Sequence, residues 1–265
     1  KSTPEVLQEL GAEMMVFGNQ PNGTNINQEC GSMSPSLLCA KVREYRADLG
    51  IAHDGDADRV VLCDEAGRLI DGDDILAIAG LRMLAEGTLA RKTVVATVMS
   101  NAGLAAAIRA AGGEVVATQV GDKHVIDLML SEGYNLGGEQ SGHLIFREHS
   151  TTGDGLVAAL QILSAMKTQG QPLSRLAKCW TRYPQLTVNL RVPSKDRVLE
   201  DVGELMDRVR AAEAELSPVG GRVLLRYSGT EPKVRLLVEG PDASVMEKWS
   251  RDICAQLRRH LGAEG

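Results

Sequence analysis

Three aspartates stand at alternate positions in the segment Asp-Gly-Asp-Ala-Asp-Arg, namely Asp54, Asp56 and Asp58. In an extended loop, residues two apart point to the same side, so the three carboxylates are expected to crowd together. At about 4 Å and an effective dielectric constant near 20, each such pair of charges repels by about 4 kcal/mol. A bound divalent cation removes this repulsion, and the spacing therefore predicts a metal site.

This aspartate loop has other interpretations. With Glu65 at the twelfth position it imitates the ligand order of an EF-hand, but Arg59 occupies the position that needs glycine for the sharp turn. A phosphatase of the haloacid-dehalogenase type would use Asp54 as its nucleophile, although Asp58 stands where that family prefers Thr or Val. A solvated acidic turn without a ligand is the third alternative.

A second loop whose residues could bind a ligand is the segment Gly-Glu-Gln-Ser-Gly-His, residues 138–143. Glu139 offers two acceptor oxygens and Ser141 a hydroxyl, a pair suited to the neighbouring hydroxyls of a sugar. The glycines on either side allow the backbone to approach a ligand closely. Taken alone, a glycine-rich turn without function explains the segment equally well, and His143 is expected to pack within the loop rather than to carry a proton.

A third loop has the composition of an anion site. Two arginines enclose hydroxyl residues and a glycine in the segment Arg-Tyr-Ser-Gly-Thr-Glu-Pro-Lys-Val-Arg. Hydroxyls and the backbone N–H groups of a glycine turn can surround a phosphate, and a guanidinium can bind two of its oxygens at once. A surface hairpin without a ligand is the alternative. The candidate residues are Arg226, Ser228, Gly229, Thr230 and Arg235.

The elements that carry the first two loops form an internal repeat. A helix, a glycine and a strand beginning at Asn101 have a counterpart beginning at Ser2. Each copy continues with a strand, a loop, a second strand and a helix that opens at Gly-Asp. The aspartate loop and the 138–143 loop occupy equivalent positions and should emerge at corresponding sheet ends, where ligands bind. The alternation predicts two tandem α/β units with mainly parallel sheets.

The two units differ at their beginning. The second unit opens with an apolar strand, residues 93–99, whereas the first opens directly on its helix. This difference predicts that the chain is the C-terminal portion of a longer protein. An incomplete first sheet exposes backbone donors and apolar surface, so we expect self-association into a homo-oligomer or local disorder near residues 1–40.

From about Ala177 the pattern changes to a separate α+β domain. A helix is expected at 197–216 and another at 243–261, with strands at 185–192, 222–227 and 234–239. The predicted fold class is therefore α/β, with two tandem mixed-sheet α/β/α units, the first truncated, followed by a smaller α+β domain. The expected boundaries are 1–70, 71–176 and 177–265.

Composition limits the possible partners. A net charge of −6 without a basic block argues against nucleic acid, and the apolar stretches are interrupted before the roughly 18 residues of a membrane span. The five cysteines are widely spaced and form no Cys-x-x-Cys pair, which is typical of reduced thiols with structural roles in a cytoplasmic enzyme.

Together and in this order, the three loops resemble those of the α-D-phosphohexomutase superfamily, and the resemblance extends to about Arg259. It implies that the aspartate loop holds Mg²⁺, that the second loop recognises a sugar and that the third binds a phosphate. The residues matched in this way are Asp54, Asp56 and Asp58 for the ion, Glu139 and Ser141 for the sugar, and Arg226, Ser228, Gly229, Thr230 and Arg235 for the phosphate that does not react.

The resemblance also implies a reaction. A phosphoserine donates its phosphoryl group to one end of a hexose phosphate, the bisphosphate reorients, and the other phosphate returns to the serine, with Mg²⁺ offsetting the developing charge. Segments 21–27, 120–125 and 151–155 look most like the branch that interconverts glucosamine 6-phosphate and glucosamine 1-phosphate. The branch acting on phosphomannose and phosphoglucose, which more often carries Met at the position of Gln140, is the alternative. Lys123 would supply positive charge near the reacting phosphate.

One feature of the family is missing from the sequence. The family's nucleophile lies in a Ser-His-Asn-Pro-type loop of an N-terminal domain, and the printed sequence contains no such loop. We therefore expect no mutase turnover from this polypeptide alone. A phosphatase using Asp54, and a module that binds a divalent ion or a phosphosugar without catalysis, are the competing hypotheses. The mutase interpretation requires that the three loops converge on one cleft.

Overall fold

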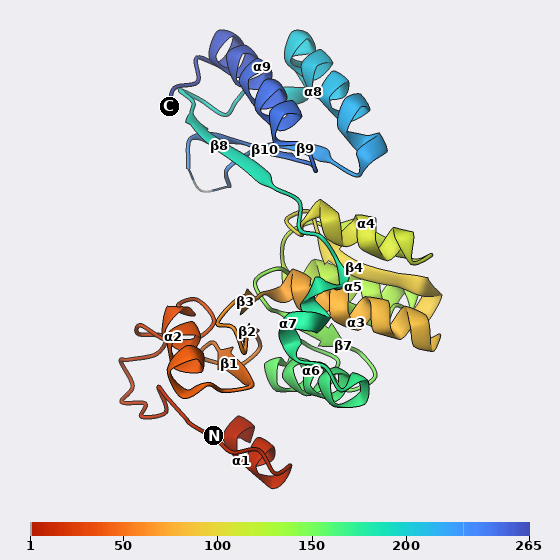
Figure 1. The fold of residues 1–265 in the computed structure, drawn as a ribbon. Coiled ribbons are helices and arrows are strands. Elements are labelled where there is room, and N and C mark those ends of the chain that lie inside the picture. Colours follow the sequence, from red (N-terminus) through yellow and green to blue (C-terminus); the bar gives the residue numbers. More distant parts are fainter. Residues whose placement is uncertain (1, 230) are drawn as a thin grey trace. The chain divides into compact units, whose positions relative to one another are not determined.

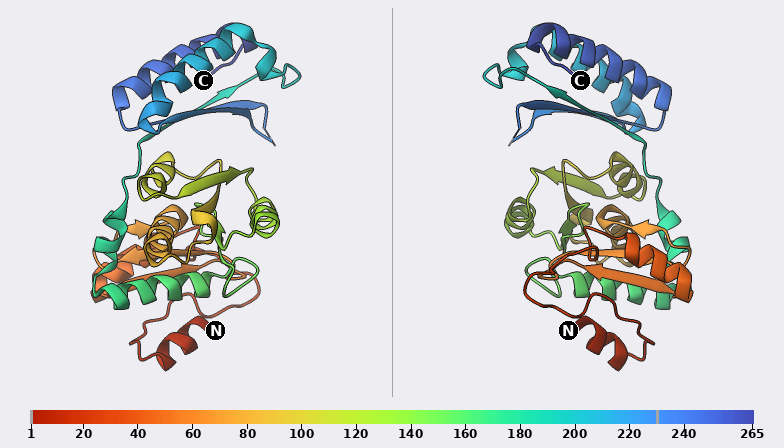
Figure 2. Two further views of the ribbon diagram at one scale, coloured as in Figure 1. Left: turned by 90° about the vertical axis from the view of Figure 1, so that its right-hand side faces the viewer. Right: turned by 90° about the vertical axis from the view of Figure 1, so that its left-hand side faces the viewer.

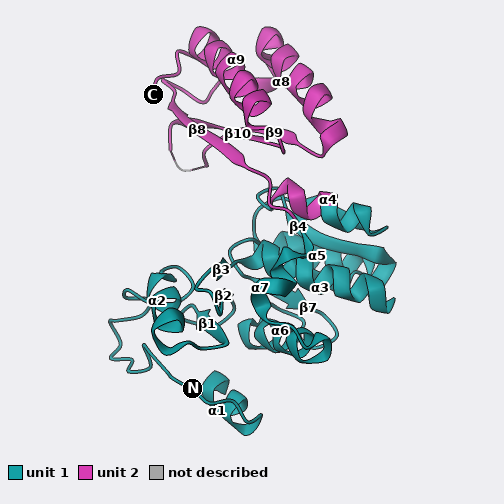
Figure 3. Ribbon diagram, viewed as in Figure 1, with its two compact units in different colours: residues 1–100, 107–180 teal, residues 101–106, 181–265 magenta. Residues whose placement is uncertain are grey.

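The computed structural model describes residues 2–229 and 231–265, which form two compact units (Figures 1 and 3). Unit 1 takes in the chain up to Ser100 together with Ala107–Trp180, and unit 2 takes in Asn101–Ala106 with Thr181–Gly265. Sheets with helices packed on them confirm the predicted α/β fold class, and one of these sheets is mixed. The expected boundaries after residues 70 and 176 stay predictions.

The first sheet of unit 1 is entirely antiparallel. Its order is β1-β2-β3, and every residue of β2 is buried. Helix α2 packs on β1, where a Cβ at Gly50 would lie 2.6 Å from a methyl of Val42. The prediction of mainly parallel sheets is thus wrong for this part of the chain. The elements are α1 (Ser2–Glu9), α2 (Ser36–Tyr45), β1 (Leu49–His53), β2 (Val60–Asp64) and β3 (Leu69–Ile70).

The strand that the repeat predicts after α1 is absent. Residues 12–17 form no strand, and the apolar side chains of Met15, Val16 and Phe17 are 40–45% exposed. A strand needs a neighbour to accept its backbone hydrogen bonds, and none of the described strands pairs with this segment. Self-association or local disorder near residues 1–40 stays a prediction.

The second sheet of unit 1 is mixed and has the order β5-β4-β6-β7. Strand β4 runs parallel to β5 and β6, and β7 closes the sheet antiparallel to β6. The elements of this part of the chain are α3 (Gly72–Glu86), β4 (Thr93–Thr97), α4 (Ala102–Ala110), β5 (Glu114–Thr118), α5 (Asp122–Glu132), β6 (Leu136–Gly138), β7 (Leu144–Phe146), α6 (Gly155–Gln169) and α7 (Leu173–Leu176), and α4 is divided between the two units after Ala106.

Helices cover both faces of this second sheet. A Cβ at Gly80 in α3 would meet Val94 at 2.9 Å, whereas Val95 packs in a cluster with Val125 and Met129 of α5. Successive residues of a strand point to opposite faces, so α3 and α5 lie on opposite sides of β4. The prediction of an α/β/α unit is confirmed here, and Figure 2 shows the helices flanking the strands.

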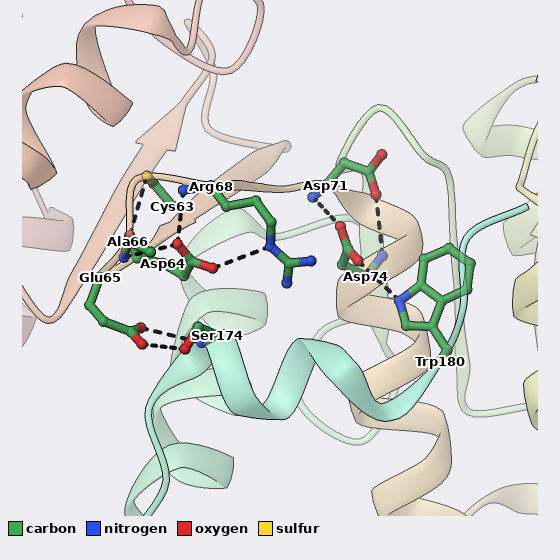
Figure 4. A network of polar contacts seen from close by, with 9 residues as sticks. All are labelled: Cys63, Asp64, Glu65, Ala66, Arg68, Asp71, Asp74, Ser174 and Trp180. Carbon is green, nitrogen blue, oxygen red and sulfur yellow. Dashed lines mark hydrogen bonds and ion pairs between the residues drawn. The ribbon is translucent and has the colours of Figure 1, made fainter. Parts of the chain in front are cut away.

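Polar contacts join the turn after β2 to α7, and the start of α3 to Trp180 (Figure 4). Asp71 and Asp74 form a capping box at the start of α3, and Asp74 Oδ1 also accepts a hydrogen bond of 3.0 Å from Trp180 Nε1. The carboxylate of Glu65, in the turn after β2, accepts a hydrogen bond from the hydroxyl of Ser174 in α7. The capping box and the bond from Trp180 fix the start of α3, which borders the candidate site described below.

Unit 2 contains an antiparallel sheet of order β8-β10-β9. Figure 2 shows α8 and α9 on the same side of this sheet, where they enclose a core that includes Val234, Leu236 and Trp249. The elements are β8 (Gln185–Arg191), α8 (Gly203–Leu216), β9 (Arg222–Tyr227), β10 (Lys233–Glu239) and α9 (Ala243–Leu261).

The helix expected from residue 197 begins later, at Gly203. A 3₁₀ turn, Leu199–Asp201, precedes it, and Leu199 and Val202 are both buried. Residues three apart in a 3₁₀ turn point the same way, so this turn directs both side chains into the core. Among the helices of the residues described, none combines the length and the apolarity needed to cross a membrane.

Candidate functional site

The aspartate loop connects the antiparallel strands β1 and β2, whose register ends at the pair His53 and Val60. One carboxylate oxygen from each of Asp54, Asp56 and Asp58 lies within 4.8 Å of the others. The structure therefore brings the three predicted ligands together. The strands on both sides of the loop remove the EF-hand alternative, which requires helices.

Arg59 offsets only part of the charge of this triad. Its backbone N–H donates a hydrogen bond of 3.2 Å to Asp54 Oδ1, and its Nε lies 3.5 Å from Asp54 Oδ2 and 3.8 Å from Asp58 Oδ1. Three carboxylates with one guanidinium leave a net negative charge. Asp58 Oδ1 is buried and has no hydrogen-bond partner among the residues described. A buried carboxylate oxygen in this state is suited to a cation that prefers oxygen ligands.

The 138–143 loop, which connects β6 and β7, lies against the aspartate loop. Arg59 and His143 form an antiparallel bridge, and the N–H of Val60 donates to the carbonyl of Gly142 at 3.0 Å. Gly142 has φ +97°, and a Cβ there would lie 2.2 Å from the carbonyl oxygen of Val60. Only glycine permits this conformation at this distance. The two loops that the repeat placed at equivalent positions are thus in direct contact.

His143 makes the shortest link between the two loops. Its side chain is buried, and Nδ1 lies 2.9 Å from Asp58 Oδ2. The ring also packs on Gly153, where a Cβ would lie 2.3 Å from Cε1. His143 is buried, as a packing role requires, but its side chain contacts Asp58 and Gly153, which lie outside its own loop, and the contact with a member of the aspartate triad was not predicted. No local pattern indicates a partner 85 residues away.

Glu139 links its loop to the start of α5 and to Ser141. Its Oε1 accepts a hydrogen bond of 2.9 Å from the N–H of Gly121, and its Oε2 accepts one of 3.5 Å from the hydroxyl of Ser141. A Cβ at Gly72 would lie 2.0 Å from the carbonyl oxygen of Glu139, so the start of α3 closely approaches the loop. Ser141 is exposed, and together the two side chains present acceptor and donor groups to solvent.

Lys123 lies on the first turn of α5, two residues after Gly121. Its side chain is exposed and forms no hydrogen bond or ion pair within residues 2–229 and 231–265. The contact between Gly121 and Glu139 places the start of this helix beside the 138–143 loop. The structure therefore brings the backbone of this segment to the loop, while a role for the Lys123 ammonium stays a prediction.

The third predicted loop lies in unit 2, at the turn of the hairpin formed by β9 and β10. Arg226 and Arg235 are directly opposite each other in the register, so their side chains share one face. Like charges at such positions destabilise a hairpin unless an anion or an acidic group offsets them. Glu231 lies 3.3 Å from Arg235 Nη2, yet Arg235 Nε is buried without a hydrogen-bond partner in the described chain.

Other residues around this loop contribute buried groups and additional charges. Ser228 is 3% exposed, and its N–H donates to the carbonyl of Lys233 at 2.8 Å. The prediction for Thr230 lies outside the described residues. The hydrogen bond from the Lys233 ammonium, together with its positive charge, lowers the pKa of Glu231, which therefore stays ionised beside Arg235. Sequence reasoning missed Lys195, whose Nζ donates to the carbonyls of Ser228 at 3.0 Å and Gly229 at 3.3 Å.

The three loops are thus distributed over two units. The aspartate and 138–143 loops belong to unit 1, and the anion loop belongs to unit 2. Their convergence on one cleft stays a prediction.

Comparison with protein families gives two matches along the chain. Residues 71–183 match the phosphoglucomutase/phosphomannomutase alpha/beta/alpha domain III, and residues 188–256 match the phosphoglucomutase/phosphomannomutase C-terminal domain. Together the two matches take in more than half of the chain.

Curated relatives are similar over almost the whole chain. The phosphoglucosamine mutase of Syntrophotalea carbinolica is 51% identical over 262 residues, which are 99% of this chain and 57% of the relative. The phosphoglucosamine mutase of Geobacter sp. (strain M21) is 50% identical over 264 residues, 100% of this chain and 58% of the relative. The chain thus spans little more than half the length of these relatives.

Solved structures share the fold. A phosphoglucomutase/phosphomannomutase family protein from Burkholderia thailandensis has a TM-score of 0.74 at 23% identity, covering 97% of this chain and 57% of that protein. Aspergillus fumigatus N-acetylphosphoglucosamine mutase, in complex with GlcNAc-6P and magnesium, has a TM-score of 0.67 at 22% identity, covering 87% of this chain and 57% of that protein.

Proposed function

The chain belongs to the phosphoglucomutase/phosphomannomutase family, and on that premise we propose that its aspartate loop and its 138–143 loop form one Mg²⁺-dependent phosphosugar site. The observation that carries the proposal is the direct link between the loops. His143 Nδ1 lies 2.9 Å from Asp58 Oδ2, and the bridge between Arg59 and His143 holds the two backbones together.

The donor set fits Mg²⁺. Three carboxylates whose oxygens approach within 4.8 Å provide the hard oxygen ligands that Mg²⁺ prefers, and the exposure of Asp56 leaves room for bound water and a phosphate oxygen. Asp58 Oδ1 accepts no hydrogen bond from the described residues, and its ion-pair partner, the Arg59 Nε atom, is 3.8 Å away, so it is available to an ion. Magnesium in the Aspergillus fumigatus structure is consistent with this choice.

In this proposal each loop has a separate task. Asp54, Asp56 and Asp58 hold the ion, which when bound polarises the phosphoryl group in transfer. Glu139 and Ser141 bind neighbouring sugar hydroxyls and so orient the ring. The anion loop of unit 2 binds the phosphate that does not react, between the two guanidinium groups of Arg226 and Arg235 and beside Ser228 and Gly229. The assignment of Lys123 to the reacting phosphate is part of the same proposal.

We further propose that the whole protein interconverts glucosamine 6-phosphate and glucosamine 1-phosphate through a phosphoserine and a bisphosphate intermediate. Support comes from relatives named phosphoglucosamine mutase, whose sequences are 51% and 50% identical to this chain. Phosphomannomutase or phosphoglucomutase activity is the alternative, since Glu139 and Ser141 would serve any hexose. Turnover needs a phosphoserine loop that the printed sequence does not contain. The cytoplasmic location and the homo-oligomer stay predictions.

Calorimetric titration of glucosamine 6-phosphate into the chain, with and without MgCl₂, tests the proposal. We expect saturable binding that Glu139→Gln weakens about tenfold or more, because a charge-assisted hydrogen bond is lost. Glu114→Gln, at an exposed position of β5, is the matched control and should bind as the parent chain does. Equal affinity of the parent and the Glu139 variant would contradict the assignment.

A mutase assay separates binding from turnover. The chain alone should leave glucosamine 6-phosphate unchanged, and adding the separately produced N-terminal part of a relative should restore conversion. Equal rates on glucosamine, mannose and glucose phosphates would refute the narrower substrate. Release of inorganic phosphate by the chain, lost in Asp54→Asn, would favour the phosphatase hypothesis instead.

A further inference from the structure

Lys195 contacts the anion loop of unit 2 from outside the hairpin. It lies in the connection between β8 and α8, and its Nζ donates to the carbonyl oxygens of Ser228 at 3.0 Å and of Gly229 at 3.3 Å. One ammonium group therefore binds two successive peptide units of the loop. An ammonium has three donors around a compact charge, which allows it to serve two carbonyls at once.

These contacts fix the direction of the Gly229 amide. The described chain has no cis peptide bond, and in a trans peptide the C=O and the following N–H point in opposite directions. Because the Ser228 carbonyl points toward Lys195, the Gly229 N–H points away from it. The Ser228 N–H is already bonded to the carbonyl of Lys233, so the amide of Gly229 is the next donor along the turn.

The charge of Lys195 also changes the strength of that donor. A cation bound to the oxygen of a peptide group polarises the group and makes its N–H a stronger hydrogen-bond donor. A hollow of about 340 Å³ is lined by Lys195, Arg197 and Arg226, and among the described residues of its lining only Glu200 is acidic. The excess of positive charge favours an anion at this end of the hairpin.

We propose that Lys195 is a positioning residue of the phosphate-binding loop, which holds two carbonyls on the outer side of the turn so that the Gly229 amide is presented to the phosphate. The inference rests on the proposed phosphate-binding role of this loop. It adds a residue that acts through the peptide units of Ser228 and Gly229.

The test uses Lys195→Met, which keeps the length of the side chain and removes its charge and donors. In a ¹H–¹⁵N spectrum of the ligand-free chain, the Gly229 amide should move upfield as its donor strength falls. Affinity for inorganic phosphate and for glucosamine 6-phosphate should fall about tenfold. Lys195→Arg, which can still donate to both carbonyls, should return both readouts most of the way to the parent values.

Control variants distinguish the possible results. Lys248→Met removes an exposed lysine paired with Glu215 on the same unit and should change neither readout. If Lys195→Met does not fold, Lys195→Gln keeps a neutral donor and should show an intermediate loss. Unchanged affinity and an unmoved Gly229 amide in either variant would overturn the inference. Failure of the parent chain to bind either phosphate compound would instead refute the proposed function of the loop.

Discussion

Neutralising one aspartate of the triad should change stability in opposite directions with and without Mg²⁺. At 4.8 Å, the upper limit of the distances between the three carboxylate oxygens, two charges repel by about 3.5 kcal/mol at an effective dielectric constant of 20 and by about 0.9 kcal/mol in bulk water. Asp56 is exposed, so the smaller figure applies to its pairs. Asp56→Asn removes two of the three pairs and should stabilise the metal-free chain by about 2 kcal/mol.

With Mg²⁺ the order should reverse. An ion at one hundred times its dissociation constant stabilises the folded state by about 2.7 kcal/mol, and the variant loses most of this contribution together with a ligand. Thermal unfolding followed by circular dichroism, in EDTA and in MgCl₂, measures both effects. The variant should melt roughly 4–8 °C above the parent in EDTA, and Mg²⁺ should raise the melting temperature of the parent alone.

Asp127→Asn is the matched control for this experiment. Asp127 is an exposed aspartate of α5 in the same unit, and its neutralisation should leave both the melting temperature and the response to Mg²⁺ nearly unchanged. If Asp56→Asn destabilises the chain in EDTA, the carboxylates do not repel one another as the geometry requires. If Mg²⁺ stabilises parent and variant equally, the ion binds elsewhere.

Three further predictions concern the loops and the core of unit 1. Gly142→Ala should weaken Mg²⁺ binding measured by calorimetry, because the added Cβ would lie 2.2 Å from the Val60 carbonyl oxygen. Gly133→Ala is the control: its φ is also positive, but no atom lies within 4 Å of the added Cβ, so Mg²⁺ binding should not change. Leu76→Ala, at a fully buried position, should lower the free energy of unfolding in urea by about 2–5 kcal/mol, and a loss below 1 kcal/mol would refute the packing. Burial is the main reason why the pKa of the Cys63 thiol is raised to about 12. Iodoacetamide at pH 8 should therefore label this thiol roughly a thousandfold more slowly in the folded than in the unfolded chain. Equal labelling rates would contradict the burial of Cys63.

Local geometry explains what the sequence could predict about the site. The crowding of Asp54, Asp56 and Asp58 follows from their alternate spacing, and the pairing of Arg226 with Arg235 follows from a short turn between two alternating strands. Both depend on residues close together in the chain. Such features can be inferred without knowledge of the rest of the fold.

Contacts between distant segments could not be predicted in this way. The contact of His143 with Asp58 spans 85 residues, and that of Lys195 with Ser228 spans 33. Their partners depend on how whole strands and hairpins pack, which no local pattern encodes. The repeat placed two loops at corresponding sheet ends, but it could not indicate which side chains would meet.

The two errors in secondary structure have related causes. The apolar run at residues 12–17 has the composition of a strand, but a strand also needs a neighbour to pair with. The segment from residue 197 has helical composition, but a 3₁₀ turn directs Leu199 and Val202 into the core before α8 begins at Gly203. In both cases the surroundings, rather than the intrinsic preference of the residues, decide the structure.

Replacement of Mg²⁺ by paramagnetic Mn²⁺ tests most directly whether the aspartate loop and the 138–143 loop form one metal-dependent site. At one equivalent of Mn²⁺, the amide signals of Gly142 and His143 should broaden beyond detection, because their loop contacts Asp58 of the triad and the nearby Val60. Asp56→Asn should restore these signals. Sharp Gly142 and His143 signals in the parent chain, with broadening confined to other residues, would contradict the account.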